Sequence, residues 1–252
     1  MASCRLWLST TMVAAICMAF SMTARAEQTF RKEAFSIALP DGWVEIPGEV
    51  LDAYEREIAS LAPAAPRQSY DYGFQEDGAP RWLHYPYILV QIKNEGRIPE
   101  GELEKLESVS GQGEIDRRKE DLSPVISRME AGRMVYDKQA GVVWLRIEAD
   151  VVDVGPVSGL SGIVPTEKGV VQVNGYALKD DFSRYEEVFE SAIASLTPSP
   201  ELAYRSRWSD GPPPAIGGMD WGRVLERAAA GAVVGGFVAL LAALWTRRKK
   251  RS

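Results

Sequence analysis

The side chains that could act as nucleophiles, bases or metal ligands are few in this sequence. His84 is the only histidine, and the two cysteines are Cys4 and Cys17. A zinc site built on histidine needs more ligands from elsewhere, and a Ser-His-Asp triad would have to use His84. Residues 159–163 (GLSGI) differ from the G-x-S-x-G nucleophile motif at the last position. The sequence therefore predicts no thiol, zinc or serine-triad chemistry.

Carboxylates are the remaining candidates for catalysis, and they occur as two adjacent pairs. Adjacent residues on a helix point in different directions, so Glu186 and Glu187 would not face one substrate. Asp180 and Asp181 are expected in a turn. Residues 111–113 (GQG) lack the third glycine of a dinucleotide site, and no phosphate-binding loop motif is present. We predict no catalytic residue and no cofactor, and any hydrolase would have to be built from carboxylates.

Trp82, His84, Tyr85 and Tyr87 form the one cluster whose side chains suit binding. Aromatic residues in a loop anchor protein partners or stack on sugars. The alternative is that these rings pack on the edge of a sheet. We take Trp82, His84 and Tyr85 as the candidate interaction surface.

The first half of the chain predicts a hairpin, a helix and further strands that would position this cluster. Residues 35–39 and 43–46 flank a Pro-Asp-Gly turn, and apolar spacing over residues 50–61 predicts a helix. Residues 69–75 and 87–93 are expected to be strands. Residues 100–108 have the composition of a surface helix.

The second half predicts an antiparallel meander followed by a helix. Its strands are expected at 126–136, with a bulge at Gly132, and at 142–152, 157–164 and 170–178. Hydrophobic and charged residues alternate along the second of these strands. Ser183 and Glu186 match a capping box, and an apolar stripe over residues 185–196 predicts a helix that packs on the meander. The side chains expected in the core include Trp43, Trp144 and Phe189.

The N-terminal segment, residues 1–26, has the order of features of a signal peptide. Arg5 precedes an apolar run, and the small residues Ala24 and Ala26 supply an A-x-A cleavage site. The alternative is an uncleaved anchor over residues 6–22, which would be short and polar for a membrane span. We predict an exported chain whose mature part begins at Glu27 and contains no cysteine.

A C-terminal transmembrane helix is predicted over residues 224–246. Residues 228–245 are 18 uncharged, mostly apolar residues, about 27 Å as a helix. The basic tail, residues 247–252, would hold the C-terminus in the cytoplasm. Gly231 and Gly235 form a G-x-x-x-G motif that could pair two such helices in a homodimer. We therefore expect a single-pass membrane protein with its globular part outside the cytoplasm.

One globular domain, residues 27–196, is expected between these ends, followed by a Pro- and Gly-rich linker over residues 197–223. The chain has a net charge of −6, and seven of its cations but none of its acids lie in residues 1–26 and 246–252. The part between them therefore carries −13. This acidity argues against nucleic acid as a partner.

A family resemblance rests on short segments at both ends of the domain: residues 35–43 (FSIALPDGW), residues 174–178 (NGYAL), Tyr185, Phe189, Ile193, Ser195 and Leu196. These segments resemble the PsbP-like family. The family includes the extrinsic PsbP protein of photosystem II, and a Ran-binding nuclear-import factor shares its fold. The resemblance implies an α+β fold, a central antiparallel sheet with helices on both faces, whose members act mainly by binding proteins. It transfers no site residue, and residues 94–124 look like an insertion.

These observations favour a non-catalytic, membrane-anchored domain outside the cytoplasm that binds a protein partner. The alternative is an enzyme or small-molecule sensor with a carboxylate pocket on the sheet. A third interpretation takes residues 216–218, the span and the basic tail as a sorting signal, although the charges at Asp220, Arg223 and Glu226 argue against it.

Overall fold

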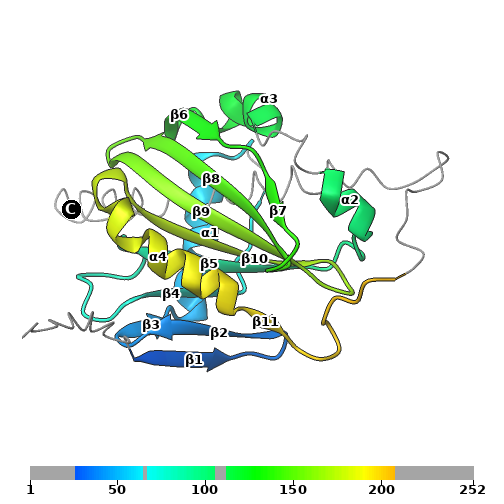
Figure 1. Cartoon of the computed structure of the whole chain (residues 1–252). Coiled ribbons are helices and arrows are strands. Elements are labelled where there is room, and N and C mark those ends of the chain that lie inside the picture. Colours follow the sequence, from blue (N-terminus) through cyan, green and yellow to red (C-terminus); the bar gives the residue numbers. More distant parts are fainter. Residues whose placement is uncertain (1–25, 65–66, 106–111, 208–252) are drawn as a thin grey trace, which may run out of the picture.

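The computed structural model describes residues 26–64, 67–105 and 112–207 (Figure 1). The predicted signal peptide up to residue 25, the transmembrane helix with Gly231 and Gly235, and the basic tail lie outside these residues. Among the described helices, none is both long enough and apolar enough to cross a bilayer.

The described chain is a mixture of strands and helices. The helices are α1 (Gly48–Leu61), α2 (Glu100–Glu104), α3 (Gln112–Leu122) and α4 (Lys179–Ser195). The strands are β1 (Glu27–Arg31), β2 (Phe35–Pro40), β3 (Trp43–Glu45), β4 (Tyr72–Glu76), β5 (Tyr87–Lys93), β6 (Ile126–Ala131), β7 (Val135–Asp137), β8 (Val142–Val151), β9 (Gly155–Pro165), β10 (Val170–Leu178) and β11 (Thr197–Pro198).

The strands form two antiparallel sheets. The 8-stranded sheet has the order β3-β4-β5-β10-β9-β8-β6, with β7 also paired to β8. A 3-stranded sheet has the order β1-β2-β11. In the centre of the large sheet, Val173 of β10 lies opposite Val90 of β5 and Gly162 of β9. The predicted central antiparallel sheet is therefore confirmed, and the small sheet is an addition to it.

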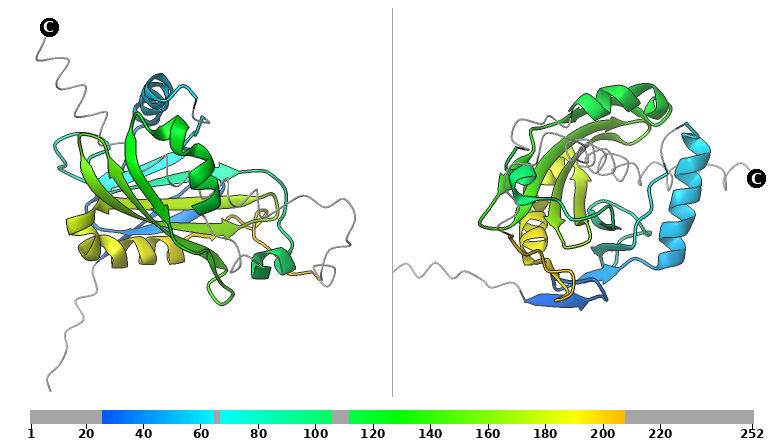
Figure 2. Two further views of the ribbon diagram at one scale, coloured as in Figure 1. Left: turned by 90° about the horizontal axis from the view of Figure 1, so that it is seen from above. Right: turned by 90° about the vertical axis from the view of Figure 1, so that its right-hand side faces the viewer.

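Helices cover both faces of the large sheet, as predicted. Figure 2 shows α4 on one side of the curved sheet and α1 on the other. Because side chains alternate along a strand, β10 contributes to both cores. Val171 and Val173 pack with α4 and the small sheet, whereas Val170 and Tyr176 pack with α1.

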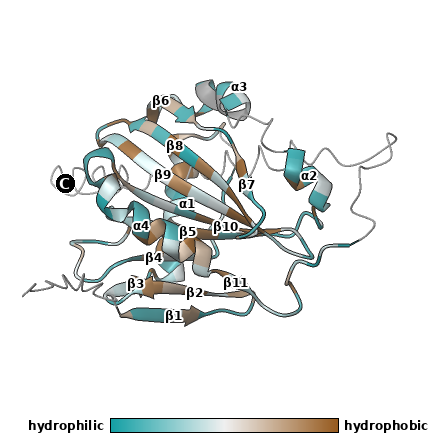
Figure 3. Ribbon diagram, in the orientation of Figure 1, coloured by the Kyte–Doolittle hydropathy of each residue, from teal (hydrophilic) through white to brown (hydrophobic). Residues whose placement is uncertain are grey.

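The predicted apolar faces of the long helices and of β8 are confirmed. Helix α1 buries Leu51, Tyr54 and Ile58, and α4 buries Tyr185, Phe189, Ala192 and Ile193. Along β8, buried hydrophobic residues alternate with more exposed charged ones from Leu145 to Val151 (Figure 3). Trp43 and Phe189 are buried as expected, but Trp144 is only partly buried at the border of the core.

The predicted capping box at the start of α4 is wrong. The helix begins at Lys179, directly after β10, and Leu178 occupies the N-cap position without a side-chain cap hydrogen bond. Ser183 therefore lies inside the helix. Asp180 and Asp181 lie in the first turn of the helix and not in a turn that precedes it. Their negative charges stabilise the helix there, because its N-terminus is the positive end of the helix dipole. Glu186 instead forms an ion pair with Arg146 of β8.

Three further features differ from the sequence expectations. The strand predicted over residues 126–136 is divided at Gly132 into β6 and β7, which both pair with β8. Strand β1 and helix α3 were not predicted, because their sequences are polar and lack a clear period. Helix α3 lies in the expected insertion and contacts β6, where the Gln112 side-chain carbonyl accepts a hydrogen bond from the Ala131 N–H at 3.0 Å.

The first part of the predicted linker belongs to the folded domain. Strand β11 pairs with β2, and Thr166 forms a β-bridge with Ala203. The Tyr204 hydroxyl donates to the Ile98 carbonyl at 2.7 Å, and the Arg205 N–H donates to Glu167 Oε1 at 3.0 Å. Residues 197–207 are thus held to the domain by backbone and side-chain contacts, and a linker would begin only after them.

Candidate binding site at the loop between β4 and β5

The structure divides the predicted aromatic cluster between the surface and the core. All four residues lie at or beside the loop that joins β4 to β5. Trp82 is 41% exposed, and His84 is half-buried. Tyr85 and Tyr87 are buried and stack with ring centroids 4.9 Å apart. The prediction of a surface role is therefore wrong for Tyr85.

Tyr85 is buried because it joins a group of tyrosines beneath α1. The ring of Tyr87 lies 5.4 Å from that of Tyr176, and Tyr54 lies 5.9 Å from Tyr70. Burial raises the pKa of Tyr87 and of Tyr176 well above the ordinary value. These phenols therefore stay neutral at physiological pH. Their role is to pack beneath the loop, and they do not act as proton acceptors.

The buried side chain of Gln75 holds the loop on both sides of Trp82. Its Nε2 donates to the Arg81 carbonyl at 3.1 Å, and its Oε1 accepts from the Leu83 N–H at 2.6 Å. Leu83 has a φ of 58° and a buried side chain, so the chain turns sharply there. Trp82 is thus an exposed ring on a fixed backbone. The sequence analysis does not identify Gln75 as a functional residue. The one feature that could have indicated it is a polar side chain inside a predicted strand.

A cleft of about 280 Å³ lies beside this loop and extends to the start of α4. His84 Nδ1 donates to the Tyr85 carbonyl at 2.8 Å, because a carbonyl can only accept. The Tyr185 hydroxyl donates to Glu76 Oε2 at 3.2 Å. Burial, followed by the charge of Glu76, raises the pKa of Tyr185. The side chains that line the cleft include Glu76, Asp77, His84, Tyr85, Pro86, Asp181, Arg184 and Tyr185.

A second cleft of about 280 Å³ lies along the same loop and is lined in part by Val44, Arg81 and Trp82. Arg81 Nε is buried and has no hydrogen-bond partner within the described part of the chain. Glu76 and Asp77 line both clefts. A partner that reached Trp82 would therefore meet an aromatic ring, a guanidinium donor and nearby carboxylates on one surface.

The other residues singled out for chemistry do not assemble into one site. Asp181 lines the first cleft, whereas Glu186 is engaged by Arg146. Ser161 is fully buried and accepts a hydrogen bond from Gln172 Nε2 at 3.3 Å, so it is not an exposed nucleophile. Within residues 26–64, 67–105 and 112–207, no group of three acidic, histidine or cysteine side chains is placed to hold a metal ion.

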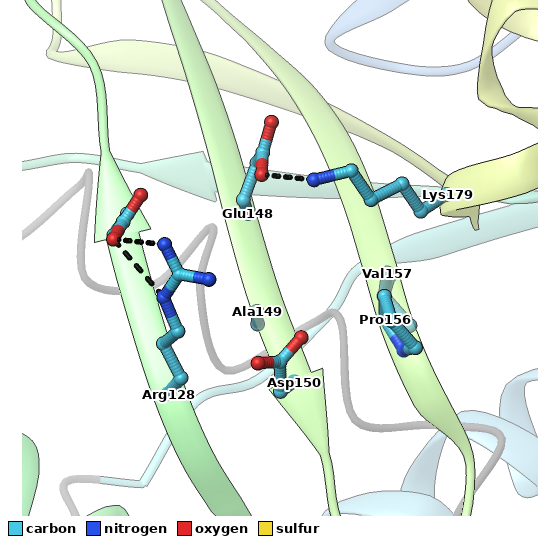
Figure 4. A pocket seen from close by; sticks show the side chains of 8 residues that line it. Arg128, Glu148, Ala149, Asp150, Pro156, Val157 and Lys179 are labelled. Carbon is cyan, nitrogen blue, oxygen red and sulfur yellow. Dashed lines mark hydrogen bonds and ion pairs between the residues drawn. The ribbon is translucent and has the colours of Figure 1, made fainter.

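A charged patch on β6 and β8 carries ion pairs but no cavity of useful size (Figure 4). Glu130 and Glu148 lie opposite each other across these strands, which is unfavourable for like charges. Arg128 pairs with Glu130 at 2.6 Å, and Lys179 pairs with Glu148 at 2.7 Å. The depression between them holds about 10 Å³, which is too small for a ligand.

Comparison with known proteins gives structural likeness without a sequence family. No protein-family model matches the chain. No curated protein matches it.

The solved structures that are similar in part include the following three. The solution structure of cyanobacterial PsbP (CyanoP) from Synechocystis sp. PCC 6803 aligns with a TM-score of 0.41 and 12% identity, covering 71% of this chain and 96% of that one. LpqN of Mycobacterium tuberculosis, described as involved in cell envelope biogenesis, aligns with a TM-score of 0.34 and 14% identity over 69% and 91%. PA94 of Pseudomonas aeruginosa, a putative regulator of unknown function, aligns with a TM-score of 0.30 and 9% identity over 69% and 98%. These scores are low, and the likeness gives no information about the function of the chain.

Proposed function

We propose that this chain is a non-catalytic, membrane-anchored domain outside the cytoplasm that binds a protein partner at the loop surface around Trp82. The placement rests on the predicted signal peptide and C-terminal span. The binding role rests on one observation: Trp82 is exposed while the Gln75 side chain fixes the backbone on both sides of it.

A tryptophan on a fixed backbone loses little backbone freedom when a partner covers it. Exposed large aromatic residues that become buried in an interface supply a large share of its binding energy. Arg81 beside Trp82 lines the same cleft and is only partly buried, so its guanidinium group could pair with a carbonyl or carboxylate of the partner. The partner surface that fits is therefore an apolar or aromatic pocket next to a hydrogen-bond acceptor.

The test is crosslinked affinity capture from membranes with the full chain as bait. We expect Trp82→Ala to lower recovery of the partner by about tenfold or more, the usual loss for a central aromatic. Val152→Ala is the matched control, because Val152 is 37% exposed but lies at the β8–β9 turn. Tyr85→Ala is unsuitable here, because this ring belongs to the core. Equal recovery with Trp82→Ala and wild type would remove the loop from the binding surface.

A second candidate function, recognition or turnover of a small molecule, is favoured by the carboxylates and His84 around the first cleft. Asp181→Asn should then abolish binding or turnover of that molecule by the purified protein without changing which proteins are captured. If Asp181→Asn instead abolished protein capture, and the wild type neither bound nor converted a small molecule, this second function would be excluded. Protein binding would then be the only function supported.

A further inference from the structure

Within the described residues, strand β1 is an edge of the 3-stranded sheet and pairs with β2 alone (Figure 1). The Lys32 N–H donates to the Phe35 carbonyl at 2.7 Å, one position beyond the paired residues Arg31 and Ser36. Backbone hydrogen bonds of an antiparallel pair alternate along the strand. Even-numbered residues of β1 therefore bond to β2, and the backbone groups of Glu27, Thr29 and Arg31 point away from it.

The side chains of these three residues are also exposed. They lie on the solvent face of β1, whereas Phe30 points inward and contacts Phe74 with ring centroids 4.8 Å apart. Among the described residues, no ion pair involves Glu27 or Arg31. Edge strands of natural proteins usually carry charges that discourage pairing with other chains. Here the two charges have opposite signs and stand symmetrically about Thr29.

This symmetry makes β1 complementary to itself. When two copies of the strand are set antiparallel with Thr29 opposite Thr29, Glu27 of each copy lies opposite Arg31 of the other. All three outward-facing residues then form hydrogen-bonded pairs, and both charge pairs lie on one face. If the twofold axis passes through residue 28 or residue 30 instead, only two outward-facing residues of each strand lie opposite one another. Glu27 and Arg31 then no longer lie opposite each other.

We propose that β1 pairs antiparallel with β1 of a second copy of this chain about a twofold axis at Thr29. The pairing joins the two small sheets edge to edge and does not depend on the surface at Trp82. A five-residue strand buries too little area for a stable dimer in dilute solution. Two copies anchored in one membrane are held at high effective concentration, which makes a small interface sufficient.

The experiment is disulfide crosslinking of the full chain in isolated membranes. Cys4 and Cys17 lie in the predicted signal peptide, so an introduced cysteine is the only thiol of the mature chain. Thr29→Cys places two thiols at the twofold axis, where a hydrogen-bonded pair has a Cα separation of about 5.5 Å, within the range of a disulfide. Gln28→Cys is the control, because position 28 lies opposite position 30 of the second copy and its side chain is on the other face. We expect a crosslinked dimer with Thr29→Cys and little with Gln28→Cys.

Charge exchange tests the register. In the Thr29→Cys background, Glu27→Arg or Arg31→Glu alone should lower the dimer yield by about tenfold, because like charges then meet twice. The double exchange should restore the yield, and so should mixing the two single variants, since each then meets its opposite. Equal yields from Thr29→Cys and Gln28→Cys would overturn the proposal. The proposal would also be overturned if the charge-exchange variants gave the same dimer yield as Thr29→Cys alone, or if the crosslinked band contained a different protein.

Discussion

Gly175 lies directly beneath the ring of Phe189. A β-carbon on Gly175 would stand 2.4 Å from Cδ1 of Phe189, and one on Gly162 of the neighbouring strand would stand 2.1 Å from Cγ2 of Ile193. Two glycines on adjacent strands thus leave room for two large side chains of α4. This close approach sets the distance between the helix and the sheet.

Gly175→Ala should therefore destabilise the domain by about 1–3 kcal/mol, since the Phe189 ring is fully buried and cannot move aside without straining the core. The free energy of unfolding in urea measures the change. Gly132→Ala is the control, because its nearest contact would be the Arg146 carbonyl at an ordinary 3.6 Å. Equal stability of the two variants would show that α4 packs less tightly than the structure indicates.

Gln75→Leu should loosen the loop that carries Trp82. The substitution removes the donor to Arg81 and the acceptor for Leu83, at a cost of about 1–3 kcal/mol for groups left unpaired in a buried place. We expect faster hydrogen exchange at the Leu83 amide and weaker partner capture. Gln75→Glu keeps the acceptor and loses the donor, so its Leu83 amide should stay more protected than in Gln75→Leu. Unchanged exchange in Gln75→Leu would rule out this role of Gln75.

Attachment of residues 199–207 should depend on pH through Glu167. Burial alone would raise the pKa of Glu167, but hydrogen bonds from the Arg205 N–H and Arg97, with the charge of Arg207, lower it. A lowered folded-state pKa stabilises the attached state above the unfolded-state pKa of about 4.3, and the effect is lost as the pH falls through the folded-state value. Hydrogen exchange of residues 199–207, corrected for its intrinsic pH dependence, should therefore increase on acidification below about pH 4.

Two substitutions control this experiment. Glu167→Gln should exchange faster in this segment at neutral pH and should lose the pH dependence. Glu201→Gln changes an exposed carboxylate of the same segment and should keep the wild-type profile. A pH profile that survives in Glu167→Gln would assign the titration to another group.

The sequence by itself determined the elements whose side chains follow a regular period. The alternation along β8 and the apolar stripes of α1 and α4 predicted both the elements and their buried faces, because burial on one side leaves a local pattern. The same reasoning predicted the antiparallel meander. The helices on both faces of the sheet were implied instead by the resemblance to the PsbP-like family. The signal peptide, the transmembrane helix and its glycine pair remain sequence predictions outside the described residues.

Only the tertiary structure decided where the aromatic cluster points and where the domain ends. Trp82 and Tyr85 are alike in the sequence, but the tyrosines beneath α1 bury Tyr85, while Gln75 holds the backbone beside Trp82 at the surface. Contacts with Glu167 attach a segment that its composition marks as linker. These outcomes depend on contacts between residues that are distant in the sequence, and such contacts leave no periodic pattern in the local sequence.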